Sequence, residues 1–433
     1  MDTSIRSRLR QRTIDTMKKS MQSSLVHVLQ AYEKRRNILA DEKLQGVCQG
    51  YEKISEEMQA ERGNRMKQIR AAVIGFGGMG SQYARMIYDG EIEGMCLAGV
   101  CCRNKKGQEI LKREYPKASL YRDVEDALAH RDEFDAAVIV TPHTSHVEIG
   151  LSMVKAGKHI LVDKPAGVCA GAVRGLVQAA EENQVSFGMI FNIRMKPVFQ
   201  KAKDLLEQGA LGRITRVAWI CNTWFRTPAY HNSAPWRSSW AGEGGGLLIN
   251  QSQHYLDIWQ WLFGMPDEVL ATLDYGKFND FDVDDNADIQ FFYRNGIHGT
   301  FITSSGENPG VNRLEIWGTK GRLAVEDTSR MILDENVMAT DEFARKNQEI
   351  YGVLKHRNRE ILVDVDERGY QKLLANFADH LLTGTPLVAE GREGLKAVVI
   401  TNGAYFSSWQ ERKVALPVEE SVFEAALRER QRG

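Results

Sequence analysis

Hydrophobic and polar positions follow two different rhythms along the chain. Between residues 67 and 190, short apolar runs such as 69–74 and 136–140 alternate with segments whose apolar residues have helical spacing. Uninterrupted apolar runs are typical of strands buried on both faces, and strands that alternate with helices are typical of parallel sheets. The pattern therefore predicts an α/β domain with a doubly wound parallel sheet over 67–190.

After residue 210 the apolar runs follow one another with only short turns between them. Segments such as 213–225, 287–293 and 312–327 are rich in β-branched and aromatic residues, which favour strands. Short turns between strands indicate antiparallel pairing. We therefore expect an α+β domain over 191–433 with a large open, mostly antiparallel sheet, and helices near the C-terminus that pack back on the body.

Residues 1–66 carry two apolar stripes at helical spacing. The stripes consist of Ile14, Met17, Met21, Leu25, Val28 and Tyr32, and of Leu44, Val47, Tyr51, Ile54 and Met58. Amphipathic helices must bury such stripes against another surface. We expect residues 1–66 to form a helical extension outside the two-domain body, and a homo-oligomer that these helices extend.

Composition and charge are those of a soluble globular protein. Of the 433 residues, 43% are hydrophobic, and 56 Lys and Arg nearly balance 57 Asp and Glu. The first 68 residues hold 14 basic and 9 acidic residues, a pattern more typical of a solvated helix face than of a nucleic-acid arm. The chain has no apolar run long enough for a bilayer and no secretory signal. We expect a cytoplasmic protein with no nucleic-acid or membrane partner.

A glycine-rich turn follows the first apolar run. It reads Gly75-Phe76-Gly77-Gly78-Met79-Gly80 and matches G-x-G-x-x-G between a predicted strand and a predicted helix. In that context the first glycine permits the tight turn, the second lets the backbone approach a pyrophosphate, and the third lets helix and strand pack closely. The alternative is a turn that merely needs glycines. The sequence thus favours a Rossmann domain that binds a dinucleotide.

The second predicted strand lacks the acidic residue that usually binds the adenosine ribose. That position lies about 20 residues beyond the glycines, where Cys102 and Arg103 stand instead. Arginine could bind a 2′-phosphate or stack on adenine, and the backbone or Asn104 could bind the ribose hydroxyls. We expect NAD as the cofactor and leave NADP open.

Six motifs in a fixed order point to a known family. They are GFGGMG (75–80), TPHTSH (141–146), DKPAG (163–167), PWRSSW (235–240), GGGLLINQSQHYLDIWQWLFG (244–264) and IWGTKGRL (316–323). Together they resemble the glucose–fructose oxidoreductase / inositol dehydrogenase (Gfo/Idh/MocA) family of sugar oxidoreductases, over about residues 67–420. The resemblance implies a Rossmann domain followed by a substrate-binding domain whose open sheet mediates oligomerisation.

Lys164 and His254 are the candidate catalytic residues. Lys164 ends a predicted parallel strand, and ligands bind beyond the carboxyl ends of such strands. Alcohol oxidation needs a base within reach of the hydroxyl, and the resemblance implies that Lys164 is this base or a proton relay, with Asp163 orienting it. It also implies His254 as the second group, but an acid at position 250, where this chain has Asn250. An amide cannot take a proton at neutral pH, so we expect Asn250 to bind a substrate hydroxyl.

Further residues are expected around the reacting centre. Thr141, Pro142 and His146 are predicted to line the nicotinamide pocket. Substrate binding is assigned to Asn192, Arg194, Arg226, Tyr230, Trp236, Arg237, Asn250 and His254, because amides, charged forks and aromatic faces recognise polyols. The aromatic members could instead belong to the core. Asp257 is expected to be structural, and no His or Cys spacing indicates a metal site.

These observations predict an NAD(P)-dependent dehydrogenase that oxidises a secondary hydroxyl of a sugar, glycoside or cyclitol. Analogy with the family favours a pyranose or glycoside oxidised at C3. Two alternatives stay open. One is glycoside cleavage through transient oxidation by tightly held NAD, which would use the same Lys and His. The other is a non-catalytic sugar or redox sensor, which the presence of Lys164 and His254 argues against.

Overall fold

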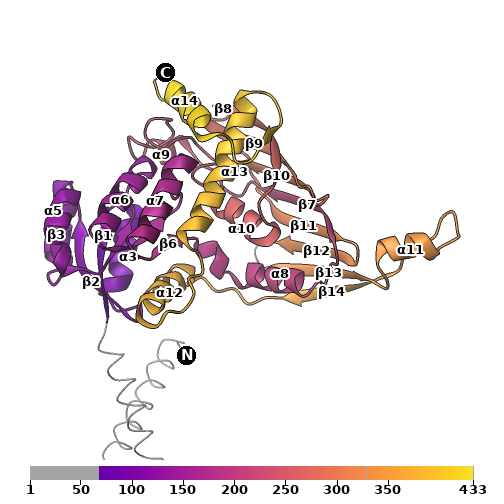
Figure 1. Ribbon diagram of the computed structural model, residues 1–433, viewed down its shortest axis with the longest axis horizontal. Coiled ribbons are helices and arrows are strands. Elements are labelled where there is room, and N and C mark those ends of the chain that lie inside the picture. Colours follow the sequence, from indigo (N-terminus) through magenta and orange to yellow (C-terminus); the bar gives the residue numbers. More distant parts are fainter. Residues whose placement is uncertain (1–67, 328, 433) are drawn as a thin grey trace, which may run out of the picture. The chain divides into compact units, whose positions relative to one another are not determined.

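The computed structural model describes residues 68–327 and 329–432. The predicted helical extension over 1–66, and with it the expected assembly through these helices, lies outside the described residues. Within the described part, which belongs to one compact unit, the chain builds two sheets (Figure 1).

The first sheet has six parallel strands in the order β3-β2-β1-β4-β5-β6. They are β1 (Ile69–Ile74), β2 (Met95–Cys101), β3 (Ser119–Tyr121), β4 (Ala136–Ile139), β5 (His159–Asp163) and β6 (Phe187–Ile190). Side chains alternate between the two faces of a strand, so Ala71 and Val73 enter one core while Ala72 and Ile74 enter the other. The predicted doubly wound parallel sheet is confirmed.

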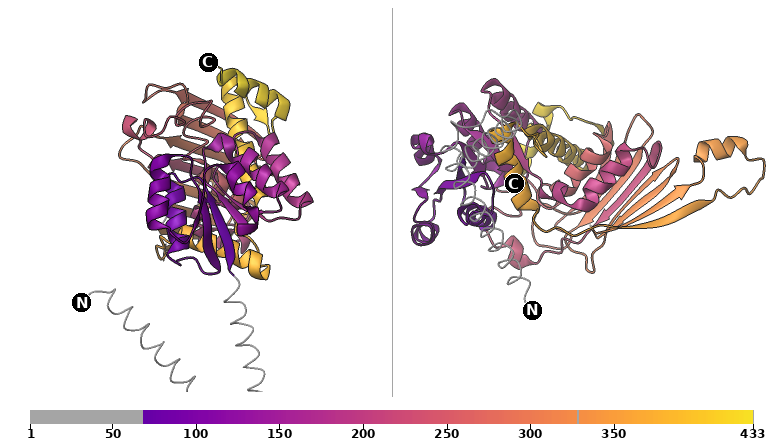
Figure 2. Two further views of the ribbon diagram at one scale, coloured as in Figure 1. Left: turned by 90° about the vertical axis from the view of Figure 1, so that its left-hand side faces the viewer. Right: turned by 90° about the horizontal axis from the view of Figure 1, so that it is seen from below.

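Helices cover both faces of this sheet (Figures 1 and 2). One face packs on α6 (His146–Lys155), α7 (Ala170–Glu182) and α13 (Gly391–Trp409). The other packs on α3 (Gly78–Tyr88), α4 (Lys105–Glu114) and α12 (Gly369–Thr383). The short α5 (Val124–Ala129) precedes β4. Two helices from the C-terminal part of the chain, α12 and α13, thus complete the layers of a sheet built from its N-terminal part.

The second sheet has nine strands in the order β14-β13-β12-β11-β7-β10-β9-β8-β15. They are β7 (Ile214–Cys221), β8 (Glu268–Tyr275), β9 (Asp284–Phe292), β10 (His298–Ser304), β11 (Asn312–Gly318), β12 (Gly321–Glu326), β13 (Arg330–Asn336), β14 (His356–Leu362) and β15 (Val414–Ala415). The β7–β10 pair is parallel and the other pairs are antiparallel. The predicted open, mostly antiparallel sheet is confirmed.

One face of the second sheet is buried under α8 (Pro197–Glu207), α10 (Gln253–Phe263) and part of α13. Strand β9 shows that only one face of the sheet is apolar. Ile289 and Phe291 are buried, while Asp288 and Gln290 alternate with them and are exposed. Beyond β13 the sheet continues toward α11 (Thr340–Lys346), which projects from its far end (Figure 2).

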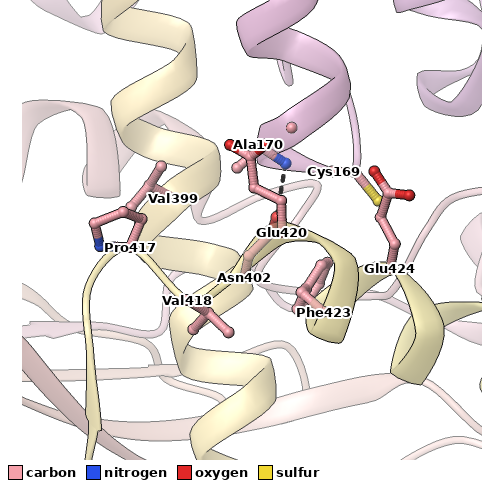
Figure 3. Close-up of a pocket in the computed structure, with 10 residues that line it drawn as sticks. Cys169, Ala170, Val399, Asn402, Pro417, Val418, Glu420, Phe423 and Glu424 are labelled. Carbon is pink, nitrogen blue, oxygen red and sulfur yellow. Dashed lines mark hydrogen bonds between the residues drawn. The ribbon is translucent and has the colours of Figure 1, made fainter.

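The last helix, α14 (Glu420–Arg430), packs against α7 and α13 and leaves a small pocket between them (Figure 3). Beside this pocket, Asn402 of α13 binds the first residue of α7, because its Oδ1 accepts the N–H of Ala170 at 2.9 Å. None of the predicted site residues lines the pocket. Among the described residues, no helix is both long and apolar enough to cross a membrane, and the five cysteines found there are free thiols.

Candidate active site

The glycine-rich turn connects β1 to α3 as the motif predicts. Gly75 has φ +107°, and a Cβ on it would lie 2.6 Å from the carbonyl oxygen of Val140. A Cβ on Gly80 would collide with the carbonyl oxygen of Gly75, so helix and strand approach as closely as backbones allow. A Cβ on Gly77 or Gly78 would meet nothing within 4 Å. The turn is therefore tight on its inner side and open on its outer side.

The open side of the turn suits a pyrophosphate. Helix α3 begins at Gly78, has no side-chain cap, and carries no acidic residue in its first turn. Its first N–H groups and the positive end of its dipole therefore face outward. The residues present thus fit the phosphates of a dinucleotide.

Replacing Gly77 by Asp tests this fit. The backbone of Gly77 (φ −89°) suits any residue and the space around it is free, so the melting temperature is expected to stay near that of the wild type. A carboxylate beside the pyrophosphate should raise the dissociation constant of NAD roughly tenfold to a hundredfold, measured by calorimetry. Gly80→Ala is the contrasting variant: it should lose about 1–3 kcal/mol of unfolding free energy through backbone overlap. Unchanged NAD affinity in Gly77→Asp would contradict this placement.

The end of β2 differs from the expectation in one respect. The Cys102 thiol is buried beside Gly107 under α4, so this residue can reach a cofactor only through its backbone. Asn104 caps α4 by accepting the Gly107 N–H at 2.6 Å. Arg103 is exposed and free to approach an adenosine. A groove between the glycine turn and α4 is lined by Phe76, Gly77, Gly78, Asn104, Lys106 and Tyr115, among others.

The loop after β4 holds the predicted nicotinamide-pocket residues. Thr141 and Pro142 are partly exposed, and the Ser145 hydroxyl binds the Thr141 hydroxyl at 2.8 Å. His146 is buried: its Nδ1 lies 2.7 Å from the carbonyl oxygen of Pro165 and its Nε2 lies 2.7 Å from that of Thr141. Because both ring nitrogens bind backbone, His146 braces the loops after β4 and β5. That His146 lines the nicotinamide pocket stays a prediction, with both of its ring nitrogens engaged by backbone.

Lys164 directly follows β5, and its amine is fixed by a single residue of the second domain. Its Nζ donates to the carbonyl oxygen of Asn250 at 3.1 Å and to the Asn250 Oδ1 at 2.9 Å. The nitrogen has three positions besides its bond to Cε, so one remains for a substrate: an N–H in the ammonium and the lone pair in the neutral amine. Burial lowers the pKa of Lys164, against the opposing charges of Asp163 and Glu243. Burial thus weakens the hold of this amine on its proton relative to an exposed lysine, which is the direction that a base requires.

Asp163 supports Lys164 through the backbone. Its Oδ1 accepts the Lys164 N–H at 2.9 Å. Burial raises the pKa of Asp163 to about 6, while the charge of Lys164 opposes the rise. The orientation expected from sequence therefore acts on the main chain of Lys164 rather than on its amine.

Glu243 is a site residue that sequence reasoning missed. It is 3% exposed, and its Oε1 accepts the side-chain N–H of Asn250 in a short hydrogen bond. Burial raises its pKa to about 7, and the neighbouring donors and cations oppose the rise. The signal that could have revealed it is a lone acid placed directly before three glycines, in a stretch that is otherwise small and apolar.

His254 lies in the first turn of α10 and is buried. Its Nδ1 has no hydrogen-bond partner among the described residues. Burial, followed by the nearby charges of Lys164 and Lys196, holds the pKa of His254 well below its ordinary value. Burial therefore disfavours the charged form of His254, and its Nδ1 is a buried nitrogen without a partner among the described residues.

Arg194, which was predicted to bind substrate, is buried and engaged inside the protein. It is 2% exposed, and its Nε and Nη2 bind the Asp257 carboxylate at 2.7 and 2.6 Å. The remaining donors bind Glu393 at 2.7 Å and the carbonyl oxygen of Val388 at 3.0 Å. Every nitrogen of the guanidinium is thus used inside the protein. The structural role expected of Asp257 is confirmed by the same contacts.

The segment around α9 (Pro228–His231) supplies the aromatic and cationic groups. The Tyr230 hydroxyl accepts from Arg237 at 2.8 Å and from Asn250 at 3.2 Å, which links this segment to Lys164. Arg226 and Arg237 lie over the Tyr230 ring, 5.0 and 4.5 Å from its centroid. Tyr230 and Trp236 belong to none of the buried clusters of the described chain, so the alternative that these aromatics are core does not hold for them.

Several buried polar atoms at this place have no partner within the described protein. They are the Nε atoms of Arg226 and Arg237, the Nδ1 of His254 and the Oδ1 of Asn192. Buried polar groups in folded proteins are nearly always hydrogen-bonded. The unpaired donors and acceptors among the predicted substrate residues are groups that a polar ligand would satisfy. No group of three or more His, Cys, Asp or Glu in the described ranges is arranged to hold a metal ion.

A parallel sheet with a glycine-rich turn, joined to a lysine held against a second sheet domain, defines a dinucleotide-dependent oxidoreductase. Two family profiles agree with this class. "Oxidoreductase family, NAD-binding Rossmann fold" matches residues 69–191, and "GFO/IDH/MocA C-terminal domain" matches residues 199–324. Together they cover more than half of the chain, which therefore belongs to the Gfo/Idh/MocA oxidoreductase family. The resemblance inferred from the motifs and the expected NAD(P) cofactor are confirmed, and the chain is an NAD(P)-dependent dehydrogenase acting on CH–OH groups.

Similar proteins span nearly the whole described chain. Myo-inositol 2-dehydrogenase of Thermotoga maritima is 22% identical over 356 residues, which are 80% of this chain and 98% of that protein. The WlbA dehydrogenase from Bordetella pertussis, solved with NADH and UDP-GlcNAcA, has a TM-score of 0.68 at 23% identity and covers 81% of this chain and 100% of its own. Levoglucosan dehydrogenase, solved with NADH and levoglucosan, has a TM-score of 0.67 at 20% identity with the same coverage. The two solved structures share the fold.

Proposed function

We propose that this protein oxidises a secondary hydroxyl of a sugar, glycoside or cyclitol, with Lys164 as the base. The observation that carries the proposal is the amine of Lys164, which donates to two oxygens of Asn250 and so keeps its third position, the lone pair of the neutral amine, for a hydroxyl proton. His254, Arg226, Arg237 and Asn192, all predicted substrate residues, each carry a polar atom without a partner among the described residues. Hydroxyl groups both donate and accept hydrogen bonds, so a polyol satisfies this mixed set.

Each residue of the site has a separate role in alcohol oxidation. Bound NAD(P) supplies the hydride acceptor. Lys164, whose pKa is lowered by burial, accepts the hydroxyl proton in its neutral form as the carbon is oxidised. The neutral His254 binds the same or a neighbouring hydroxyl through its unpaired Nδ1. Tyr230, Arg226 and Arg237 orient the rest of the ring, and the aromatic faces suit the C–H side of a sugar.

The similar proteins support this substrate class. One is named for myo-inositol, and two were solved with a nucleotide-linked sugar acid or with levoglucosan. Within the class we favour a pyranose or glycoside, with C3 as the carbon that the family resemblance suggests.

A substrate panel tests the proposal. Pyranoses, glycosides, inositols and acyclic 2-hydroxy acids are offered to the purified full chain with NAD and with NADP separately, and reduced cofactor is followed by absorbance. We expect reduced cofactor to accumulate with at least one cyclic polyol, and the same panel with Lys164→Met gives the background. Turnover confined to 2-hydroxy acids would contradict the proposal. Glycoside cleavage without accumulation of reduced cofactor would favour the cleavage reaction instead.

A further inference from the structure

Glu243 is a buried acid for which the reaction has so far no use. It lies between the substrate segment and the triple glycine that precedes α10. Its two carboxylate oxygens are both occupied: Oε2 accepts the Ser238 N–H at 2.6 Å, and Oε1 accepts the Asn250 side chain. A buried carboxylate is costly unless its hydrogen bonds compensate for lost water, so the network around it is the place to look for its role.

The contacts of Glu243 decide how the Asn250 amide is oriented. A side-chain amide has one accepting end and one donating end, and either could point toward a neighbour. Both oxygens of Glu243 accept N–H groups, Oε2 from Ser238 and Oε1 from the side chain of Asn250, so the donating Nδ2 of Asn250 faces Glu243. The accepting Oδ1 is then left for the Lys164 amine, 2.9 Å away. If the amide turned over, it would present N–H groups to Lys164 and withdraw one of its two acceptors.

We propose that Glu243 is a positioning residue for Lys164, because its carboxylate fixes the Asn250 amide with the oxygen on the lysine amine and so directs the free position of that amine at the substrate. This inference rests on the proposed function, since it assigns a role within the same site. Residues 164 and 250 are 86 positions apart, so their alignment depends on such a fixed connection.

The charges around Lys164 determine how loss of Glu243 would be detected. Asp163 and Glu243 raise the pKa of Lys164, while Arg237 and Arg226 lower it. His143, His146 and His254 also face this amine, and burial lowers the pKa of each below its ordinary value. Glu243 itself faces the cations Arg237 and Lys164. Removing the charge of Glu243 should therefore lower the pKa of Lys164 further.

The test compares Glu243→Gln with Glu243→Asp. In the glutamine variant, one oxygen becomes a donor that must oppose either Ser238 or Asn250. We expect kcat to fall roughly tenfold to a hundredfold, and the rising limb of kcat against pH to move about half a unit to one unit toward acid. In the aspartate variant the charge is kept, so the limb should stay in place and part of kcat should return.

Two further variants separate positioning from general damage. Asp284 is a buried carboxylate that binds the N–H groups of Gly246 and Leu248 at 2.7 Å each, on the same loop. Asp284→Asn should lower stability but leave the limb in place. In an Asn250→Ala background there is no amide to orient, so adding Glu243→Gln should cost little further kcat. A limb that does not move in Glu243→Gln, or fully additive losses with Asn250→Ala, would overturn the inference.

A second readout does not depend on turnover. The pH dependence of acetylation of Lys164 by acetic anhydride, followed by peptide mass spectrometry of the holoenzyme, gives the pKa of its amine directly. We expect it to be lower in Glu243→Gln than in the wild type and unchanged in Asp284→Asn. If no polyol is oxidised but this shift occurs, the proposed function fails and the positioning role stands. If polyols are oxidised and the shift is absent, the proposed function stands and the positioning role of Glu243 fails.

Discussion

Replacing Lys164 by methionine is expected to reduce kcat about a hundredfold to ten-thousandfold while the protein still binds its cofactor. Methionine keeps an apolar stem of similar length but has no group that can take a proton. General bases contribute this range to catalysed reactions. The cofactor's phosphates are assigned to the turn before α3 rather than to Lys164, so the dissociation constant of NAD should change little. Single-turnover absorbance and calorimetric binding measure the two quantities.

A matched lysine controls for the loss of a long cationic side chain. Lys158 lies before β5, and its Nζ donates to the carbonyl oxygen of Phe134 at 3.0 Å. It takes no part in the site, so Lys158→Met should keep kcat near the wild-type value. Near-normal turnover in Lys164→Met would contradict the assigned base. Loss of NAD binding together with turnover would make Lys164 a structural residue instead.

Replacing Arg194 by methionine is expected to destabilise the fold strongly. The substitution leaves Asp257 buried and without its cation, since the pair is 2% and 0% exposed. Breaking a buried ion pair from one side typically costs 3–5 kcal/mol, because an uncompensated charge remains in the interior. Burial already pushes the pKa of Asp257 upward, and Arg194 is the main opposing influence. Urea denaturation of the variant measures the free energy of unfolding.

Two comparisons make the Arg194 result specific. The exposed pair of Arg392 and Glu181 has the same chemistry at the surface, and Arg392→Met should cost at most about 1 kcal/mol. The double variant Arg194→Met with Asp257→Leu removes both charges and should recover much of the lost stability. If Arg194→Met instead kept its stability and raised only the KM for the polyol, the original assignment of Arg194 to the substrate would be right.

Much of the fold could be predicted because its causes are local. The apolar runs 69–74 and 136–140 correspond to strands β1 and β4, which are covered on both faces. A parallel strand that is buried on both faces has few polar residues. The glycine pattern was equally informative, since Gly75 needs a positive φ and Gly80 leaves no room for a side chain. The placement of Lys164 followed from its position at the end of a parallel strand.

The partners of the site residues were not local. Arg194 and His146 were both predicted to lie at the site, yet the guanidinium of Arg194 binds Asp257 and the ring of His146 binds two carbonyl groups. Glu243 entered the site only because the loop before α10 brings it beside Asn250. A side chain's chemistry states what it can bind, but not which of several partners reaches it first.

The sequence by itself determined the two-sheet architecture, the dinucleotide turn and the lysine at the strand end, because periodicity and backbone requirements are written in neighbouring residues. Tertiary contacts determine which polar groups are hydrogen-bonded inside the protein and which remain for a ligand. That division depends on contacts between residues such as Lys164 and Asn250, which are 86 positions apart. Only the packing of the two sheets against α10 and α13 brings such residues within hydrogen-bond distance.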